Sequence, residues 1–111
     1  LGVMTVAQDS EYREVVRQTW MSQEQVCPLK DGPQDGCSIF TTFVMGTSGD
    51  GVTPLSGMPL LYFDDARSEA DMMLLKTPET RKHAKALEFF YRSALENPWA
   101  THIAKLDMQT Y

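Results

Sequence analysis

Residues 1–20 read LGVMTVAQDSEYREVVRQTW, and the prediction of the fold starts from this stretch. Residues 1–8 are mostly apolar and partly β-branched, which predicts a buried strand. Asp9 and Ser10 follow, and their side-chain oxygens suit the N-cap of a helix. A strand that leads directly into a helix is typical of a βαβ unit, in which the strands run parallel.

The helix after Ser10 has a regular spacing that predicts one buried face. The side chains expected on that face recur every three or four residues and are Tyr12, Val15, Val16, Thr19 and Trp20. Arg13 and Arg17 lie one turn apart on another face, where arginines most often meet solvent or form ion pairs.

The alternation of strands and helices continues along the chain. After residue 20 the expected elements are a turn-rich loop over 26–36, a strand over 38–46, an exposed Gly-, Ser- and Pro-rich connection over 47–59, a short helix over 60–68, a short strand over 71–75, a long helix, and a last strand over 100–106. This order predicts one α/β domain over residues 1–111, with a mostly parallel sheet and flanking helices.

The long helix is predicted to begin at Thr77, Pro78 and Glu79. They supply a cap, a proline suited to the first helical position and an acid for the positive helix end. Asn97 and Pro98 end the helix. Its expected buried face consists of Ala84, Leu87, Tyr91, Ala94 and Leu95.

Ligands of parallel α/β sheets bind at the carboxyl ends of the strands. The residues that follow the predicted strands are Gln8, Asp9 and Ser10, then Gly46 and Thr47, and finally residues 107–109. Asp107 is expected at the carboxyl end of a central strand.

Composition excludes several classes of function. The 111 residues carry a net charge of −5, which disfavours non-specific binding to the phosphate backbone of nucleic acid. The chain has no G-x-G-x-x-G after its first strand, no G-x-x-x-x-G-K-[ST], no G-x-S-x-G and no H-E-x-x-H. Dinucleotide oxidoreductases, P-loop enzymes, α/β-hydrolases and zincins are therefore disfavoured.

Cys27 and Cys37 are the two cysteines, and they enclose a polar loop. A zinc site is a weak interpretation, because His83 and His102 are distant in sequence. A local disulfide is more plausible and would indicate the secretory pathway, although two free thiols in a reducing compartment would give the same sequence.

An ordered set of short motifs carries a family resemblance. Residues 13–20 (REVVRQTW) fit R-x-x-[IV]-R-x-T-W, and 43–46 (FVMG) and 69–72 (EADM) follow in order. Lys85 precedes residues 105–111 (KLDMQTY) by 20 residues. Together these segments resemble glycosyltransferase family 31, the inverting β-1,3-galactosyl- and N-acetylglucosaminyltransferases, and particularly its trypanosomatid members.

The resemblance implies the nucleotide-sugar-binding half of a GT-A fold. It implies hexosyl transfer from UDP-galactose or UDP-N-acetylglucosamine to a glycan acceptor, in protein glycosylation at the lumenal side of the Golgi membrane. The membrane would be reached only through an anchor that this sequence lacks. The implied nucleotide-sugar-binding residues are Arg13, Arg17, Asp71, Lys85 and Asp107, and the implied Mn²⁺ ligands are Asp107 and Gln109.

Two departures from the family pattern affect these implications. The family has K-x-D-D-D where this chain has Asp107, Met108 and Gln109, and the last acid would normally hold the metal. A neutral amide oxygen is a poorer ligand for a hard cation than a carboxylate, so a weakened Mn²⁺ site is expected. The family's catalytic base lies beyond this motif and can be assigned to no residue here, so the chain by itself is expected to transfer no sugar.

Other readings of the same residues stay open. Asp71 could meet the uracil or only cap a turn, Lys85 could pair with Glu88, and Lys105 could pair with a neighbouring carboxylate. At the level of function, the alternatives are a non-catalytic nucleotide-binding or degenerate remnant of such an enzyme, and an unrelated α/β interaction domain.

Overall fold

The structure, a computed structural model, describes residues 1–49 and 60–107. Within them, the strands β1 (Gly2–Met4), β2 (Val26–Pro28), β3 (Ile39–Met45), β4 (Met72–Leu74) and β5 (Lys105–Asp107) form one sheet. The helices are α1 (Ser10–Gln18), α2 (Leu60–Arg67) and α3 (Lys82–Glu96), with short 3₁₀ segments η1 (Trp20–Ser22) and η2 (Leu29–Asp31). The prediction of an α/β fold with a mostly parallel sheet is confirmed.

The long strand β3 organises the sheet. On one side it pairs with β1, which pairs in turn with β5. On the other side β2 and β4 lie in series, β2 against residues 39–41 and β4 against residues 43–45. All these pairs are parallel, so the strands end at the same edge. In the described sheet β5 is an outer strand, so the expectation that Asp107 ends a central strand is wrong.

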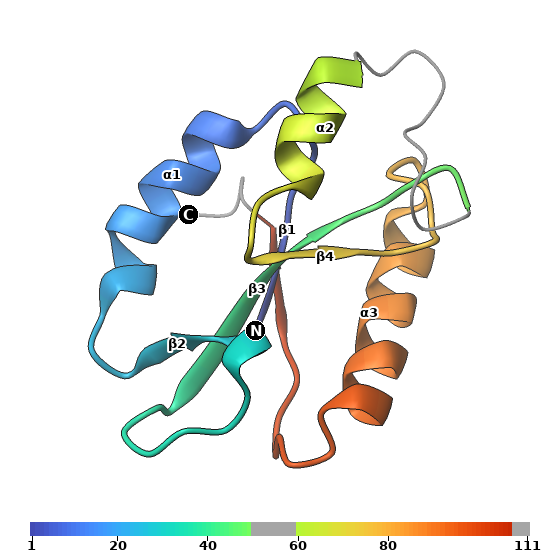
Figure 1. Cartoon of the computed structure of the whole chain (residues 1–111). Coiled ribbons are helices and arrows are strands. Elements are labelled where there is room, and N and C mark those ends of the chain that lie inside the picture. The colour runs from blue at the N-terminus through green and yellow to red at the C-terminus, as the bar shows by residue number, and fades with distance from the viewer. Residues whose placement is uncertain (50–59, 108–111) are drawn as a thin grey trace.

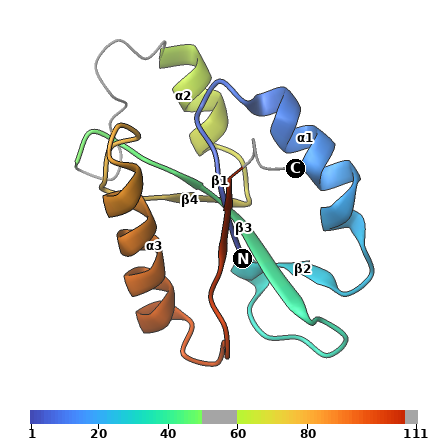
Figure 2. The same ribbon diagram turned by 180° about the vertical axis from the view of Figure 1, so that it is seen from behind.

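Helices cover both faces of the sheet. Helices α1 and α3 lie on opposite sides of it, and α2 lies on the α1 side (Figures 1 and 2). Alternate residues of β3 supply the two cores, because successive strand side chains point to opposite faces. Phe43 packs with Val3 and Val16 beneath α1, whereas Val44 packs with Phe89 of α3.

The predicted buried face of α1 is wrong. Val16 is buried and Trp20 is half-buried, but Tyr12 and Val15 are 55% and 58% exposed. The side chain of Arg13 is turned inward instead and is fully buried. The helix is rotated in this way because the guanidinium finds acceptors between α1 and the sheet.

The long helix differs from the prediction in both its start and its buried face. It begins at Lys82, and neither Thr77 nor Glu79 caps its first turn, because their side chains bond to Glu88 and Lys85 farther along the same helix. The expected apolar face points outward, with Leu87, Tyr91 and Leu95 between 64% and 70% exposed. The side chains that α3 buries are Lys85, Phe89 and Ser93.

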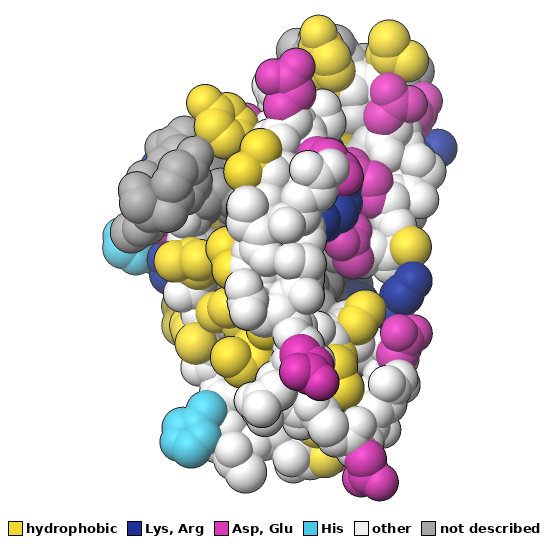
Figure 3. Space-filling model, turned by 90° about the vertical axis from the view of Figure 1, so that its left-hand side faces the viewer, with side chains coloured by type: hydrophobic (Ala, Val, Ile, Leu, Met, Phe, Trp, Pro, Cys, Tyr) yellow, Lys and Arg dark blue, Asp and Glu magenta, His cyan; other side chains and the backbone are white. Residues whose placement is uncertain are grey.

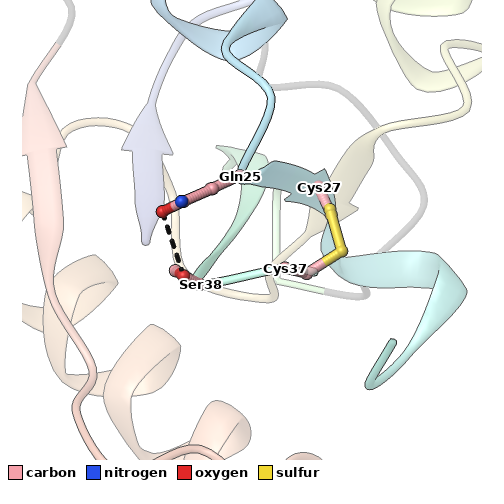
Figure 4. The surroundings of a disulfide bond; sticks show 4 residues. All are labelled: Gln25, Cys27, Cys37 and Ser38. Atoms are coloured by element: carbon pink, nitrogen blue, oxygen red, sulfur yellow. Dashed lines mark hydrogen bonds between the residues drawn. A yellow bond between two sulfur atoms is a disulfide. The ribbon is translucent and has the colours of Figure 1, made fainter. Parts of the chain in front are cut away.

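The segment predicted as a turn-rich loop contains β2 and η2 and is closed by a disulfide. Cys27, within β2, is bonded to Cys37 just before β3. Figure 4 shows this bond and, beside it, the hydrogen bond between the side chains of Ser38 and Gln25. The disulfide interpretation of the two cysteines is therefore confirmed. The predicted connection over 47–59 lies mostly outside the described residues.

Candidate functional site

The loop after β1, residues 5–9, lies at the carboxyl edge of the sheet and is fixed by one buried side chain. Arg13 donates hydrogen bonds to Oγ1 of Thr5 (3.1 Å) and to the carbonyl oxygens of Val6 (2.7 Å) and Ala7 (3.3 Å). A guanidinium presents its donors in a rigid planar fork. Arg13 therefore holds three consecutive loop residues in one geometry.

The charge of Arg13 is balanced by a network that spans three elements. Its Nη2 lies 2.7 Å from Oε2 of Glu69, in the turn after α2. Arg17 also pairs with Glu69, and it forms two hydrogen bonds of 2.9 and 2.7 Å to Asp71. Its guanidinium carbon lies 4.9 Å from the centre of the Phe43 ring. The structure thus brings together Arg13, Arg17 and Asp71, and shows all three bound within the chain.

These contacts shift the protonation of the network. Burial by itself would raise the pKa of Glu69, but hydrogen bonds from Arg13 and Arg17 outweigh it and lower that pKa below its ordinary value. The hydrogen bond to Asp71 raises the pKa of Arg17. Both shifts favour the charged forms of Glu69 and Arg17. On the face that carries α1, small basic areas lie among acidic side chains (Figure 3).

A second buried cation holds the same loop from the other face of the sheet. Nζ of Lys85 donates to the carbonyl oxygen of Thr5 (3.0 Å) and pairs with Oε2 of Glu79 (2.8 Å). Glu79 also accepts a hydrogen bond from the backbone amide of Gly46. A Cβ at position 46 would collide with the Thr77 carbonyl oxygen, so the close approach requires glycine here. Lys85 and Glu79 thereby connect the loops after β1 and β3.

The end of β3 is also connected to β4. Thr47 is buried, and its hydroxyl donates to the carbonyl oxygen of Leu75 (2.8 Å). Next to this contact, Glu88 of α3 accepts hydrogen bonds from the Thr77 hydroxyl (2.6 Å) and from the backbone amides of Lys76 and Thr77. Burial would raise the pKa of Glu88, but these hydrogen bonds lower it overall. The carboxyl edge is therefore fixed by side chains from α1 and α3.

Asp107 is the last residue of β5, and the register places it beside Met4 of β1. Its carboxylate is exposed and lies 3.5 Å from Nζ of Lys105. Gln109, the second expected metal ligand, lies outside the described residues. Among residues 1–49 and 60–107, no three His, Cys, Asp or Glu side chains form a group suited to a metal.

In the same part of the chain no helix has the length and apolar character needed to cross a membrane.

The sequence reasoning missed two functional partners. Glu69 stands in a segment that carries the resemblance, which implies no role for it, and the sequence pattern predicts Glu79 only as an acid at the helix end. Both are needed because Arg13 and Lys85 are buried, and a buried cation requires a counter-charge. Sequence distance hides the first pair, since Glu69 is 56 residues from Arg13, whereas Glu79 is only 6 residues from Lys85.

The edge can offer a ligand two kinds of group. One is the exposed carboxylate of Asp107. The other is the set of backbone amides at the start of α1, which have no capping bond from the side chain of Asp9 and no other partner among residues 1–49 and 60–107. Such amides, together with the positive end of the helix dipole, attract anions.

Comparisons with protein-family models, with curated proteins and with solved structures find no match for this chain.

Proposed function

We propose that this chain is the UDP-sugar-binding half of an inverting β-1,3-hexosyltransferase that transfers galactose or N-acetylglucosamine to a glycan. The observation that supports it is the placement of Asp107 beside the end of β1, whose following loop is held from both sheet faces by Arg13 and Lys85. Nucleotides bind at this edge in parallel α/β sheets.

The geometry favours an anionic diphosphate at the end of β1. The free amides at the start of α1 can donate to phosphate oxygens, and the fixed loop keeps them in place before the ligand arrives. The cations of Arg13, Arg17 and Lys85 are neutralised by carboxylates of the chain. We therefore assign them to positioning the loops of the site.

The donor set fits a divalent cation that protein and nucleotide share. Asp107 supplies one carboxylate, and Mg²⁺- or Mn²⁺-type sites often use one or two carboxylates together with substrate phosphates. Asp107 would hold the cation, with Gln109 as a neutral second ligand. When bound, such a cation offsets the negative charge that develops on the departing diphosphate.

The disulfide supports the compartment that this proposal requires. Bonds such as Cys27–Cys37 persist in oxidising compartments and are rare in the cytosol. We accordingly place the chain on the lumenal side of the Golgi membrane.

Isothermal titration with UDP, with and without Mn²⁺, tests the proposal. We expect Mn²⁺ to strengthen UDP binding, Asp107→Asn to weaken the Mn²⁺-dependent part about tenfold, and Gln109→Asp to strengthen it. Asp35→Asn, an exposed change in the disulfide loop at the opposite edge, is the matched control and should have no effect.

Two results would count against this function. Absence of UDP binding under every condition would favour an unrelated interaction domain. UDP binding that ignores both Mn²⁺ and Asp107→Asn would favour a non-catalytic nucleotide-binding module.

A further inference from the structure

Strand β4 has a free edge, and the register shows which of its backbone groups point outward. The amide of Phe43 donates to the carbonyl oxygen of Asp71, and the amide of Leu75 donates to that of Met45, both at 2.9 Å. Alternate residues of a strand in a parallel pair direct their N–H and C=O groups to opposite sides. Met72 and Leu74 therefore direct theirs away from β3.

One of these four outward groups is already used. The carbonyl oxygen of Leu74 accepts a hydrogen bond of 2.6 Å from Nη1 of Arg92 on α3. The N–H and C=O of Met72 and the N–H of Leu74 have no partner within residues 1–49 and 60–107. An edge with unpaired groups is a template on which another strand can pair.

A cleft of about 690 Å³ runs along this edge. Its walls are β4, η2 and the second half of α3, and its lining also includes Thr41 and Thr42 of β3. The cleft borders β4 along its whole length, so an extended chain can lie against the free backbone groups. It lies on the other side of β3 from β5 and Asp107, although Lys76 and Glu88 of its lining also belong to the carboxyl edge.

The charges in the cleft indicate what kind of chain fits. Its acids are engaged: Asp71 pairs with Arg17, Glu96 pairs with Arg92, and Glu88 accepts three hydrogen bonds from residues 76 and 77. Lys30 and Lys76 are exposed and make no ion pair in the described part of the chain. The two free charged groups of the cleft are therefore positive.

We propose that the cleft binds an extended acidic peptide segment of a partner protein, which pairs with β4 as an added strand. The peptide backbone supplies the missing partners of Met72 and Leu74, as in other cases of strand addition. Its carboxylates pair with Lys30 and Lys76. This proposal does not depend on nucleotide binding.

The probe is a capped octapeptide of alternating valine and glutamate, titrated into the whole chain without nucleotide. We expect it to bind, and expect Lys30→Glu or Lys76→Glu to weaken binding about tenfold. Lys82→Glu, at the exposed start of α3, is the matched control and should leave binding unchanged. The corresponding valine–lysine peptide should not bind.

Two further tests separate strand pairing from simple charge attraction. The same valine–glutamate peptide with every amide N-methylated has no N–H to donate and should not bind. Leu74→Pro removes an outward N–H that β3 does not use, so the sheet should persist while peptide binding is lost. If Leu74→Pro prevents folding, the lysine variants and the methylated peptide still decide the matter.

Failure of the valine–glutamate peptide to bind would overturn the proposal. Equal binding of the N-methylated peptide would also overturn it, since the cleft would then recognise side chains and not a strand. Loss of UDP binding in the earlier titration would leave this proposal unaffected.

Discussion

Arg13 is fully buried, and the fold can bury this charged side chain because its donors form hydrogen bonds. Its donors reach both oxygens of Glu69, the Thr5 hydroxyl and two loop carbonyls. Removing a guanidinium from water costs several kcal/mol, which good geometry and satisfied donors can offset. The Arg13 side chain therefore stays in the interior. It holds the loop of the candidate site in place but does not face a ligand there.

Arg13→Met should lower the free energy of unfolding by about 3 kcal/mol or more, because removing one partner of a buried ion pair leaves charge uncompensated. Urea denaturation measures this change. Arg67→Met is the matched control: Arg67 forms an exposed pair with Asp64 at 3.2 Å, and such pairs contribute about 0–1 kcal/mol. Equal effects of the two substitutions would show that Arg13 does not hold the network described.

Glu69 should make the stability depend on acid pH. Its folded-state pKa lies below the ordinary value, so its contribution is complete above the ordinary glutamate pKa of about 4.3 and is lost as the pH falls through the folded pKa. We therefore expect the free energy of unfolding to decrease as the pH is lowered below about 4.3. In Glu69→Gln this dependence should be shallower, and an unchanged pH profile would contradict the assignment.

At the scale of elements, α1 and α3 share an arrangement in which a basic side chain is buried toward the sheet beside an apolar one, while other apolar side chains are exposed. In α3, Phe89 is 2% exposed and packs with Val44, whereas Tyr91 is 70% exposed. Phe89→Ala should therefore lower the free energy of unfolding by about 3–5 kcal/mol. Tyr91→Ala should change it by about 0.5 kcal/mol or less. Thermal and urea denaturation measure both changes. A larger loss of stability in Tyr91→Ala than in Phe89→Ala would contradict the observed orientation and favour the buried face predicted from the spacing of apolar residues.

This reversal shows what the sequence could and could not predict. The β-branched and aromatic residues of 38–46 correctly indicate β3, where Phe43, Val44 and Met45 face the core. Helix α2 also forms where it is predicted, although Leu61 and Tyr62 are exposed. In α1 and α3 the spacing of apolar residues predicts the wrong face, since Arg13 and Lys85 are buried against Glu69 and Glu79. Helical periodicity reflects only the residues of the helix itself, whereas each buried cation is stabilised by a carboxylate outside its helix.

The candidate site was predictable to a similar extent. The position of Asp107 at the carboxyl end of a strand follows from the apolar residues before it and is confirmed. The grouping of Arg17 with Asp71 depends on tertiary packing between α1 and the start of β4, 54 residues apart. Pattern alone therefore locates the edge of the sheet, but not which of its charges face outward.

At the scale of the molecule, two buried cations on opposite faces of one sheet fix a single loop. Arg13 reaches it from α1, and Lys85 reaches it from α3. The loop after β3 is connected to the same arrangement through Glu79 and Gly46. Such a fixed edge suits a ligand that must be held in one orientation, because less conformational freedom is lost on binding.

The most direct test is a backbone amide NMR titration of the ¹⁵N-labelled chain with UDP in the presence of Mg²⁺. The account predicts shifts in residues 5–9, 46–49 and 105–107, at the carboxyl ends of β1, β3 and β5, with residues 32–38 at the opposite edge unchanged. In Asp107→Asn these shifts should need a higher UDP concentration. Shifts confined to residues 32–38 or to the β4 cleft, or no shift with UDP at all, would contradict nucleotide binding at this edge.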